Sequence, residues 1–259
     1  MKAIILAGGL GTRLSKYTKE VPKCMLEFLG KSLIQRQVET YRDCSVNDII
    51  IIRKHLANKI DISGVRYYDE KDINTHMVVG LFQARNEFND DIIISYGDLL
   101  FEKSVLNKVI NFKGDVGVVV DTNWKNYWEA RYDSINNDLE SLMIENDQIK
   151  SLGISTSDPN LMHARYVGLI KFSKNIIDKI EGVYDEAKSK FWDNPWYTSK
   201  SFKKAYMTDF IQALIDSGIK VEPIKINRGW LEFDTNEDYE RTLKWAEEKS
   251  LDRFYSVND

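Results

Sequence analysis

Glycines and cations that could hold a phosphate come first in the sequence. From Leu6 to Leu26 the chain reads LAGGLGTRLSKYTKEVPKCML, with three glycines within four positions. Because glycine has no side chain, the main chain there can approach a ligand closely or adopt a positive φ. Arg13 comes two residues after the last of these glycines, and Lys23 follows ten residues later in a Pro-Lys pair. A bare backbone beside two cations indicates a site for an anion.

Two familiar phosphate-binding motifs do not fit this stretch. The dinucleotide fingerprint requires a third glycine where Leu14 stands, and the P-loop requires a Gly-Lys pair that the stretch lacks. A tight structural turn is the simpler alternative, but it needs neither three glycines nor the following Thr12-Arg13. A phosphate site at the end of the first strand is therefore the favoured interpretation.

Carboxylates that could hold a divalent cation end two later apolar runs. Asp98 closes IIISYGD, and Asp234 closes GWLEFD, with Glu232 two residues earlier on the same side of that strand. Carboxylates, phosphate oxygens and waters are the ligands that Mg²⁺ prefers. An aspartate after a strand is also a common helix cap, so the residues alone leave both roles open.

The elements that must position these residues alternate between strand and helix. Short β-branched runs without strict alternation are typical of strands buried on both faces; they are Lys2–Gly8, Asp48–Arg53, Asp91–Asp98 and Val116–Asp121, with a shorter candidate at Val65–Glu70. Helix-period stretches lie between them at Leu33–Arg42, His76–Phe88 and Lys103–Phe112. This alternation predicts an α/β doubly wound, mostly parallel sheet with helices on both faces.

The second half departs from this pattern and predicts a smaller β-rich insertion before a return to the sheet. The expected elements are a hairpin turning at Asn146-Asp147, a strand at Ala164–Ser173, an irregular loop at Phe191–Phe202, a helix at Met207–Gly218, strands at Val221–Asn227 and Gly229–Asp234, and a final helix from Asn236. No linker interrupts the chain. We expect one domain over residues 1–259, with a nucleotide-binding half over about 1–121 and an acceptor-binding half over about 122–259.

The bulk composition excludes several classes of protein. The chain has 259 residues, a net charge of −4 and 43% hydrophobic residues, which suits a globular protein with a sizeable core. No basic block is present that would bind nucleic acid. The apolar run at the start is too short for a signal peptide, and no run could span a bilayer. Two cysteines make no disulfide framework, so we expect a cytoplasmic protein.

The stretch LAGGLGTRL…PK resembles the signature of the nucleotidyltransferases that make nucleoside-diphosphate sugars and alcohols. The resemblance implies that the triphosphate is held by Leu6, Ala7, Gly8, Gly9, Gly11, Thr12 and Arg13. Arg13 would grip the β- and γ-phosphates, and Lys23 would reach the α-phosphate, which makes them the expected catalytic residues. The resemblance also favours Mg²⁺ as cofactor, with Asp98 and Asp234 as its ligands.

Within that family the chain is most similar to small cytidylyltransferases that act on phosphocholine, aminoalkylphosphonates or phosphoglutamine. This implies CTP and a small phosphate or phosphonate acceptor as substrates, with a CDP-linked product and pyrophosphate. Most sugar-type members have Pro-Leu-Thr where this chain has Lys16-Tyr17-Thr18. A sugar-1-phosphate uridylyl- or thymidylyltransferase is the runner-up, and a non-catalytic nucleotide sensor is a third interpretation. A homo-oligomer remains open.

Residues for the base and the acceptor are inferred from subgroup-level similarity. The segment INTHMVVGLFQA is similar to one that lies beside the base, which implies base contact by Asn74, Thr75 and Met77, with helix capping by Asn74 or Thr75 as the alternative. On the acceptor side the candidates are Trp124, Trp128, Arg131, Arg165, Tyr166 and Glu232. The first three would share one face of a helix, where such an aromatic stripe belongs to the core more often than to a pocket.

Overall fold

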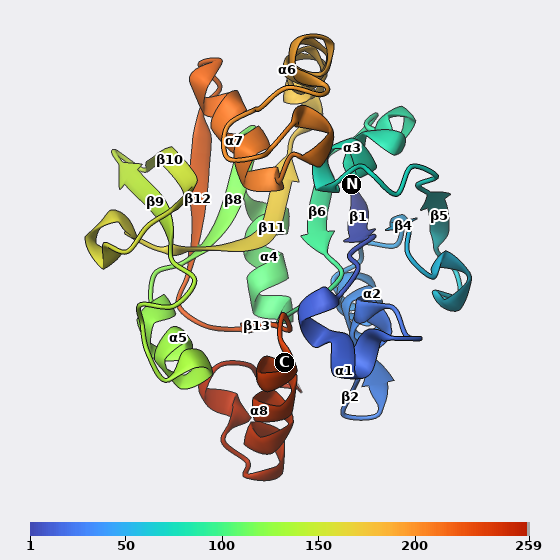
Figure 1. Cartoon of the computed structure of the whole chain (residues 1–259), viewed down its shortest axis with the longest axis vertical. Coiled ribbons are helices and arrows are strands. Elements are labelled where there is room, and N and C mark those ends of the chain that lie inside the picture. Colours follow the sequence, from blue (N-terminus) through green and yellow to red (C-terminus); the bar gives the residue numbers. More distant parts are fainter. Residues whose placement is uncertain (258–259) are drawn as a thin grey trace.

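A seven-stranded sheet runs through the centre of the computed structural model, which describes residues 1–257 (Figure 1). Its strand order is β12-β8-β11-β6-β1-β4-β5. In that order the strands are Val221–Ile226, Val116–Asp121, Arg165–Phe172, Ile92–Tyr96, Lys2–Ala7, Ile49–Arg53 and Arg66–Asp69. Neighbours are parallel except that β11 is antiparallel to both β6 and β8. The predicted mostly parallel sheet is confirmed.

Helices cover both faces of this sheet, as the doubly wound prediction requires. Successive residues of β1 enter two different cores: Ala3 and Ile5 pack on one face, and Ile4 and Leu6 on the other. The first face is covered by α2 (Leu33–Asp43) and α4 (Lys103–Asn111), with α5 (Trp124–Tyr132) and α8 (Asn236–Glu247) beyond them. The second face is covered by α3 (Met77–Gln83), α6 (Ile177–Phe191) and α7 (Met207–Asp216).

Smaller elements surround the central layers. The predicted hairpin is present as β9 (Glu140–Glu145) and β10 (Gln148–Ser155), and it turns at Asn146 and Asp147, which both have positive φ. The remaining elements are α1 (Ser15–Thr18), β2 (Glu27–Phe28), β3 (Lys31–Ser32), β7 (Leu99–Phe101) and β13 (Trp230–Glu232). Within residues 1–257, no helix is both long and apolar enough to cross a bilayer.

Two expectations from the sequence are corrected here, and one helix was missed. Gly229–Asp234 does not return to the main sheet, because its strand β13 pairs with β7 in a separate two-stranded ribbon. Helix α6 was not expected, although Ile177, Ile180 and Tyr184 follow a helical period and pack on the sheet. Helix α3 is shorter than predicted and ends at Gln83, after which the chain continues as a 3₁₀ turn.

The carboxyl ends of four parallel strands lie side by side at one edge of the sheet. Across β6, β1, β4 and β5 the residues that follow each strand include Asp98, Gly8, Lys54 and Glu70 in that order. Ligands of open α/β sheets bind in the crevice outside the carboxyl ends of the strands. This edge is therefore where a functional site is expected.

Candidate active site

A cavity of about 480 Å³ opens at this edge. Side chains and backbone from both halves of the chain line it, and the sequence-predicted residues among them are Leu6, Ala7, Gly8, Gly9, Gly11, Thr12, Arg13, Lys23, Thr75, Met77, Asp98 and Asp234. The glycine loop, the two cations and the two carboxylates therefore face one space, although more than 200 residues separate the first from the last.

The glycine loop is held in shape by the left-handed backbone conformation of Gly11 and by the hydroxyl of Thr18. Gly11 has φ +62°, and a Cβ added there would lie 3.0 Å from the Thr18 side chain. The Thr18 hydroxyl donates to the carbonyl oxygens of Gly11 at 2.8 Å and of Leu14 at 2.9 Å. Only glycine tolerates both the left-handed conformation and this close approach. The loop thus presents main chain to the cavity, and Arg13 extends from its far end, mostly exposed.

Lys23 lies between the two predicted metal ligands. Its ammonium donates to a carboxylate oxygen of Asp98 and, at 2.6 Å, to Oδ1 of Asp234. Burial alone would lower the pKa of Lys23, but the charges of Asp98 and Asp234 outweigh it and raise that pKa. Burial likewise acts to raise the pKa of Asp234, but Lys23, Arg131 and Arg13 hold it well below its usual range. The lysine is a fixed cation at any pH near neutrality.

Asp98 is positioned by a tightly packed turn between β6 and β7. A Cβ added at Gly97 would lie 3.1 Å from the Ala7 Cα, so the turn packs directly on the end of β1. The Gln37 amide donates to the carbonyl oxygens of Tyr96 at 2.8 Å and Leu99 at 2.7 Å, one on each side of the turn. One oxygen of Asp98, Oδ1, is buried and has no hydrogen-bond partner within the described residues.

Asp234 is positioned by the start of α8, but it does not cap that helix. Thr235 is the capping residue, and its hydroxyl accepts from the Asp238 N–H at 3.1 Å. In return, the Asp238 carboxylate accepts from the N–H of Thr235 at 2.9 Å and of Asp234 at 3.0 Å. The capping role that the sequence left open for Asp234 therefore falls to its neighbour Thr235, and Asp234 lines the cavity.

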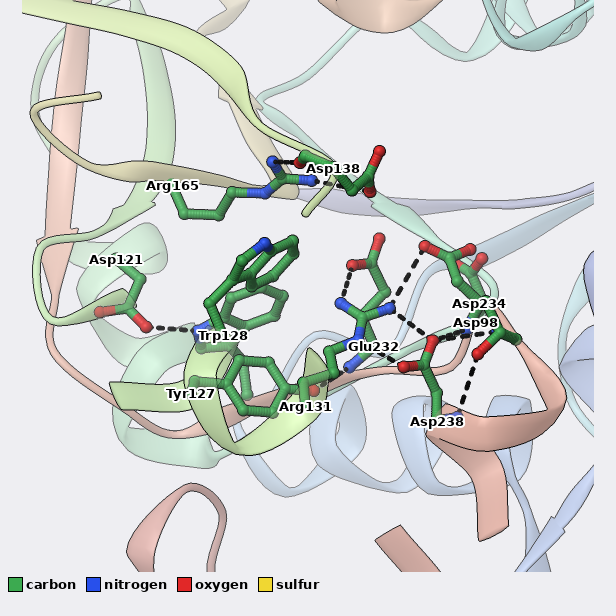
Figure 2. Close-up of polar contacts among 12 residues, drawn as sticks. Asp98, Asp121, Tyr127, Trp128, Arg131, Asp138, Arg165, Glu232, Asp234 and Asp238 are labelled. Atoms are coloured by element: carbon green, nitrogen blue, oxygen red, sulfur yellow. Dashed lines mark hydrogen bonds and ion pairs between the residues drawn. The ribbon is translucent and has the colours of Figure 1, made fainter. Parts of the chain in front are cut away.

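Arg131 is not positioned as predicted for an acceptor contact. Its guanidinium is 2% exposed and donates to both oxygens of Asp238, at 2.8 and 2.7 Å, and to Glu232 at 2.6 Å (Figure 2). A weaker contact of 3.4 Å reaches Asp234. The guanidinium N–H groups of Arg131 that would have bound a phosphate are therefore already bound to carboxylates of the protein. Arg131 instead orients the carboxylates behind the cavity.

The tryptophans of α5 are also core residues rather than pocket residues. Trp124 is 1% and Trp128 0% exposed, and neither lines the cavity. The helix that the prediction required is present, and its buried face carries both rings, as the simpler interpretation of the stripe predicted. The Arg165 guanidinium stacks on the Trp128 ring at 4.1 Å, so Trp128 helps to hold Arg165 in place (Figure 2).

Arg165, Tyr166 and Glu232 lie close to the metal-ligand candidates without lining the cavity itself. Arg165 donates to the Asp138 carbonyl oxygen at 2.7 Å, and the hydroxyls of Tyr166 and cavity-lining Tyr96 are 2.9 Å apart. Burial, and next the charge of Asp234, raise the pKa of Glu232 above its ordinary value, against the opposing effect of Arg131 and Arg165.

The base-side prediction places two of its three residues at the cavity. Thr75 and Met77 line it, whereas Asn74 is exposed and does not. Neither Asn74 nor Thr75 caps α3: the N-cap is His76, and no side chain caps that helix. The Thr75 hydroxyl instead lies within hydrogen-bond distance of Glu70, the Asp72 carbonyl oxygen and the Lys54 ammonium.

Sequence reasoning missed three charged residues of the cavity wall, Lys54, Glu70 and Lys204. Lys54 directly follows β4, and Glu70 directly follows β5, in the parallel part of the sheet. Their position at the carboxyl ends of adjacent strands was visible in the sequence, and the same rule that selected Asp98 would have selected both.

The fold is that of a nucleotidyltransferase, and the glycine loop, the cations and the carboxylates lie together at the strand ends. The family comparison agrees: residues 3–183 match the MobA-like NTP transferase domain, and the chain belongs to that family.

Individual relatives define the similarity further. The chain is 32% identical over 253 residues to a CTP:phosphoglutamine cytidylyltransferase of Campylobacter jejuni, covering 93% of this chain and 98% of that one. It is 33% identical over 192 residues to a bifunctional sugar-1-phosphate nucleotidylyltransferase/acetyltransferase of Sulfurisphaera tokodaii, covering 70% of this chain and 43% of the relative. Its fold matches a CTP:phosphocholine cytidylyltransferase structure from Streptococcus pneumoniae with a TM-score of 0.72 at 20% identity, over 95% of this chain and 98% of that one.

Proposed function

We propose that this enzyme transfers a cytidylyl group from CTP to a small phosphate or phosphonate acceptor and releases pyrophosphate. One observation carries the proposal: the Lys23 ammonium, Asp98 and Asp234 meet at a cavity whose adjoining wall is a bare glycine loop. The choice of CTP and of a non-sugar acceptor is supported by the similarity to a CTP:phosphoglutamine cytidylyltransferase over almost the full length of both chains.

Asp98 and Asp234 are the residues that would hold Mg²⁺. Within residues 1–257, no cluster of three or more histidine, cysteine or carboxylate side chains is arranged to hold a metal ion. Two carboxylates nevertheless fit Mg²⁺, which takes its remaining ligands from phosphate oxygens and waters. The unpartnered, buried Oδ1 of Asp98 is an acceptor that such a cation would satisfy. When bound, Mg²⁺ would offset the negative charge of the phosphates.

The protein's own residues then supply positioning and charge. Lys23 would lie against the α-phosphate, where charge develops as an acceptor oxygen attacks in line with the departing pyrophosphate. Arg13, at the exposed end of the glycine loop, would bind the leaving pyrophosphate. The acceptor needs no general base, because a phosphate ester with a second pKa of about 6 is already ionised near neutral pH. Arg165, Tyr166 and Glu232, which lie behind the cavity wall, are the proposed acceptor-side residues beyond the metal ligands.

Nucleotide binding with and without metal tests the first half of this proposal. We expect calorimetry to detect CTP binding with Mg²⁺ and much weaker binding after EDTA. Asp98→Asn should lose most of that difference, because one of the two metal ligands is gone. Asp178→Asn is the matched control, since this carboxylate is exposed on α6. Equal CTP affinity in Mg²⁺ and in EDTA would contradict the assigned metal site.

A further inference from the structure

A buried ion pair in the cavity wall plays no part in the phosphate chemistry above. The Lys54 ammonium lies 3.3 Å from Oε1 of Glu70, and the two side chains are only 7% and 5% exposed. Both residues line the same cavity as Lys23 and Asp98. Burying two charges is costly, so such a pair is weak support for stability by itself. Its presence at a ligand cavity calls for a functional reason.

The pair is held rigidly by Thr75, and one carboxylate oxygen is left over. The Thr75 hydroxyl donates to Oε1 of Glu70, and Lys54 donates to the Thr75 carbonyl oxygen at 2.6 Å and to its hydroxyl at 3.2 Å. The second oxygen, Oε2, receives no hydrogen bond within residues 1–257. It points toward two glycines: an added Cβ would lie 3.1 Å from it at Gly80 and 3.9 Å from it at Gly8.

These glycines leave a flat approach to the free oxygen. Both line the cavity, so backbone rather than side chain faces the space in front of Glu70. A planar ring could lie against such a surface with its edge toward Oε2. Any side chain at Gly80 would instead meet the carboxylate itself.

The distance along the sheet suits a nucleoside. Asp98 follows β6 and Glu70 follows β5, which are three strand positions apart. At about 4.8 Å per strand this is roughly 14 Å. A nucleotide whose phosphates lie at Lys23 and Asp98 would therefore extend its ribose past β1 and β4 and bring its base to Glu70.

We propose that Glu70, fixed by Lys54 and Thr75, accepts a hydrogen bond from the 4-amino group of cytosine and thereby selects CTP over UTP. This inference rests on the proposed function, because it needs the triphosphate at the opposite end of the cavity. A carboxylate only accepts hydrogen bonds, and the cytosine amino group is a donor at the pairing edge. Uracil has an oxygen at that position, so this oxygen and the Glu70 carboxylate would both be acceptors with no proton between them. Each would lose its hydrogen bonds to water without gaining another, which disfavours UTP.

Calorimetric titration with three nucleotides tests the assignment without knowledge of the acceptor. The probes are CTP, UTP and the triphosphate of pyrimidin-2-one riboside, which lacks the 4-amino group, each with Mg²⁺. We expect the wild type to bind CTP roughly ten- to hundredfold more tightly than either of the others, the discrimination of one good hydrogen bond to a base edge. Glu70→Gln should reduce the CTP-to-UTP ratio by a similar factor, because an amide can rotate to donate to the uracil oxygen.

Glu87→Gln is the matched control. Glu87 is another buried, ion-paired glutamate, bound by Lys2 at 2.8 Å, but it does not line the cavity. Its replacement removes the same charge and should leave the CTP-to-UTP ratio unchanged. The comparison separates recognition of the base from a general effect of removing a buried carboxylate.

The outcomes distinguish this inference from the proposed function. If the wild type binds CTP and the pyrimidin-2-one nucleotide equally, Glu70 does not read the amino group; this result needs no variant to fold. An unchanged CTP-to-UTP ratio in folded Glu70→Gln would also overturn the role of Glu70 while leaving CTP binding intact. A wild type that binds no nucleoside triphosphate would contradict the proposed function itself, and the assignment with it.

Discussion

Lys23 brings one positive charge between Asp98 and Asp234, two carboxylates that would otherwise repel each other. Two further cations, Arg13 and Arg131, also contact Asp234, so the charges of this cluster nearly balance without a ligand. Arriving phosphates would compete for the lysine and leave the carboxylates to a metal ion. The same three side chains would thus serve both the empty and the occupied site.

Removing the Lys23 ammonium should abolish most of the activity. We expect Lys23→Ala to lose roughly 10²–10³ in kcat, the usual effect of deleting one contact to transition-state charge. The variant should still fold, with its unfolding temperature partly restored by Mg²⁺, which can replace the missing cation between the carboxylates. Lys19→Ala, an exposed lysine on the same segment, should retain wild-type kcat. Full activity in folded Lys23→Ala would rule out the proposed mechanism.

Arg131 should contribute strongly to stability. Arg131→Met leaves Glu232 and Asp238 buried without their cation, which should cost about 3–5 kcal/mol in the free energy of unfolding. Urea denaturation measures this loss. Arg241→Met breaks a more exposed pair with Asp133 and should cost less than about 1 kcal/mol. Equal losses in the two variants would show that the buried network adds little.

At the scale of elements, short segments between strands carry the chemistry, and longer helices hold them in place. Helix α2 supplies Gln37, which is 1% exposed and bonded on both sides of the Asp98 turn. The start of α8 orients Asp234 through Thr235 and Asp238. Gln37, Thr235 and Asp238 do not line the cavity, so their effect on a ligand must be indirect.

Gln37 is therefore expected to position the metal ligand Asp98. Gln37→Met keeps the volume but leaves the carbonyl oxygens of Tyr96 and Leu99 unpaired. We expect kcat to fall roughly tenfold or more and the Mg²⁺ concentration for half-maximal rate to rise, with the KM for CTP nearly unchanged. Val38→Ala, the next residue of the same helix, should lower stability without changing the Mg²⁺ requirement. An unaltered Mg²⁺ requirement in Gln37→Met would reduce Gln37 to a packing role.

The sequence predicted these elements best where a hydrophobic run identified a strand and a polar residue stood at its end. β-branched runs predicted β1, β4, β6 and β8, and the rule for strand ends selected the glycine loop and Asp98, which line one cavity together with Lys23. Long-range pairing was less accessible. Nothing local shows that β13 pairs with β7, or that Arg131 is enclosed by the carboxylates of β13 and α8. The pattern in α5 allowed a pocket, but burial of its tryptophans was decided by tertiary packing.

At the scale of the whole molecule, the two halves of the chain complete one sheet and one site. Strands β1, β4, β5 and β6 bring the glycine loop, Lys54, Glu70 and Asp98 to a common edge. The later segments add Asp234 at the same cavity and place Arg165 and Glu232 beside it. The proposed reaction between two substrates would suit this division, with the nucleotide on the early strands and the acceptor beside the later ones.

Pyrophosphate release tests this account most directly. The wild type would be assayed with Mg²⁺ and each of CTP, UTP, dTTP, ATP and GTP, paired with phosphoglutamine, 2-aminoethylphosphonate, phosphocholine or glucose 1-phosphate. The account predicts release with CTP and one of the three non-sugar acceptors. Release only with UTP or dTTP and glucose 1-phosphate would contradict it and identify a sugar nucleotidyltransferase. Absence of release from every pair, with CTP still bound, would contradict transfer to acceptors of this kind and favour a nucleotide sensor.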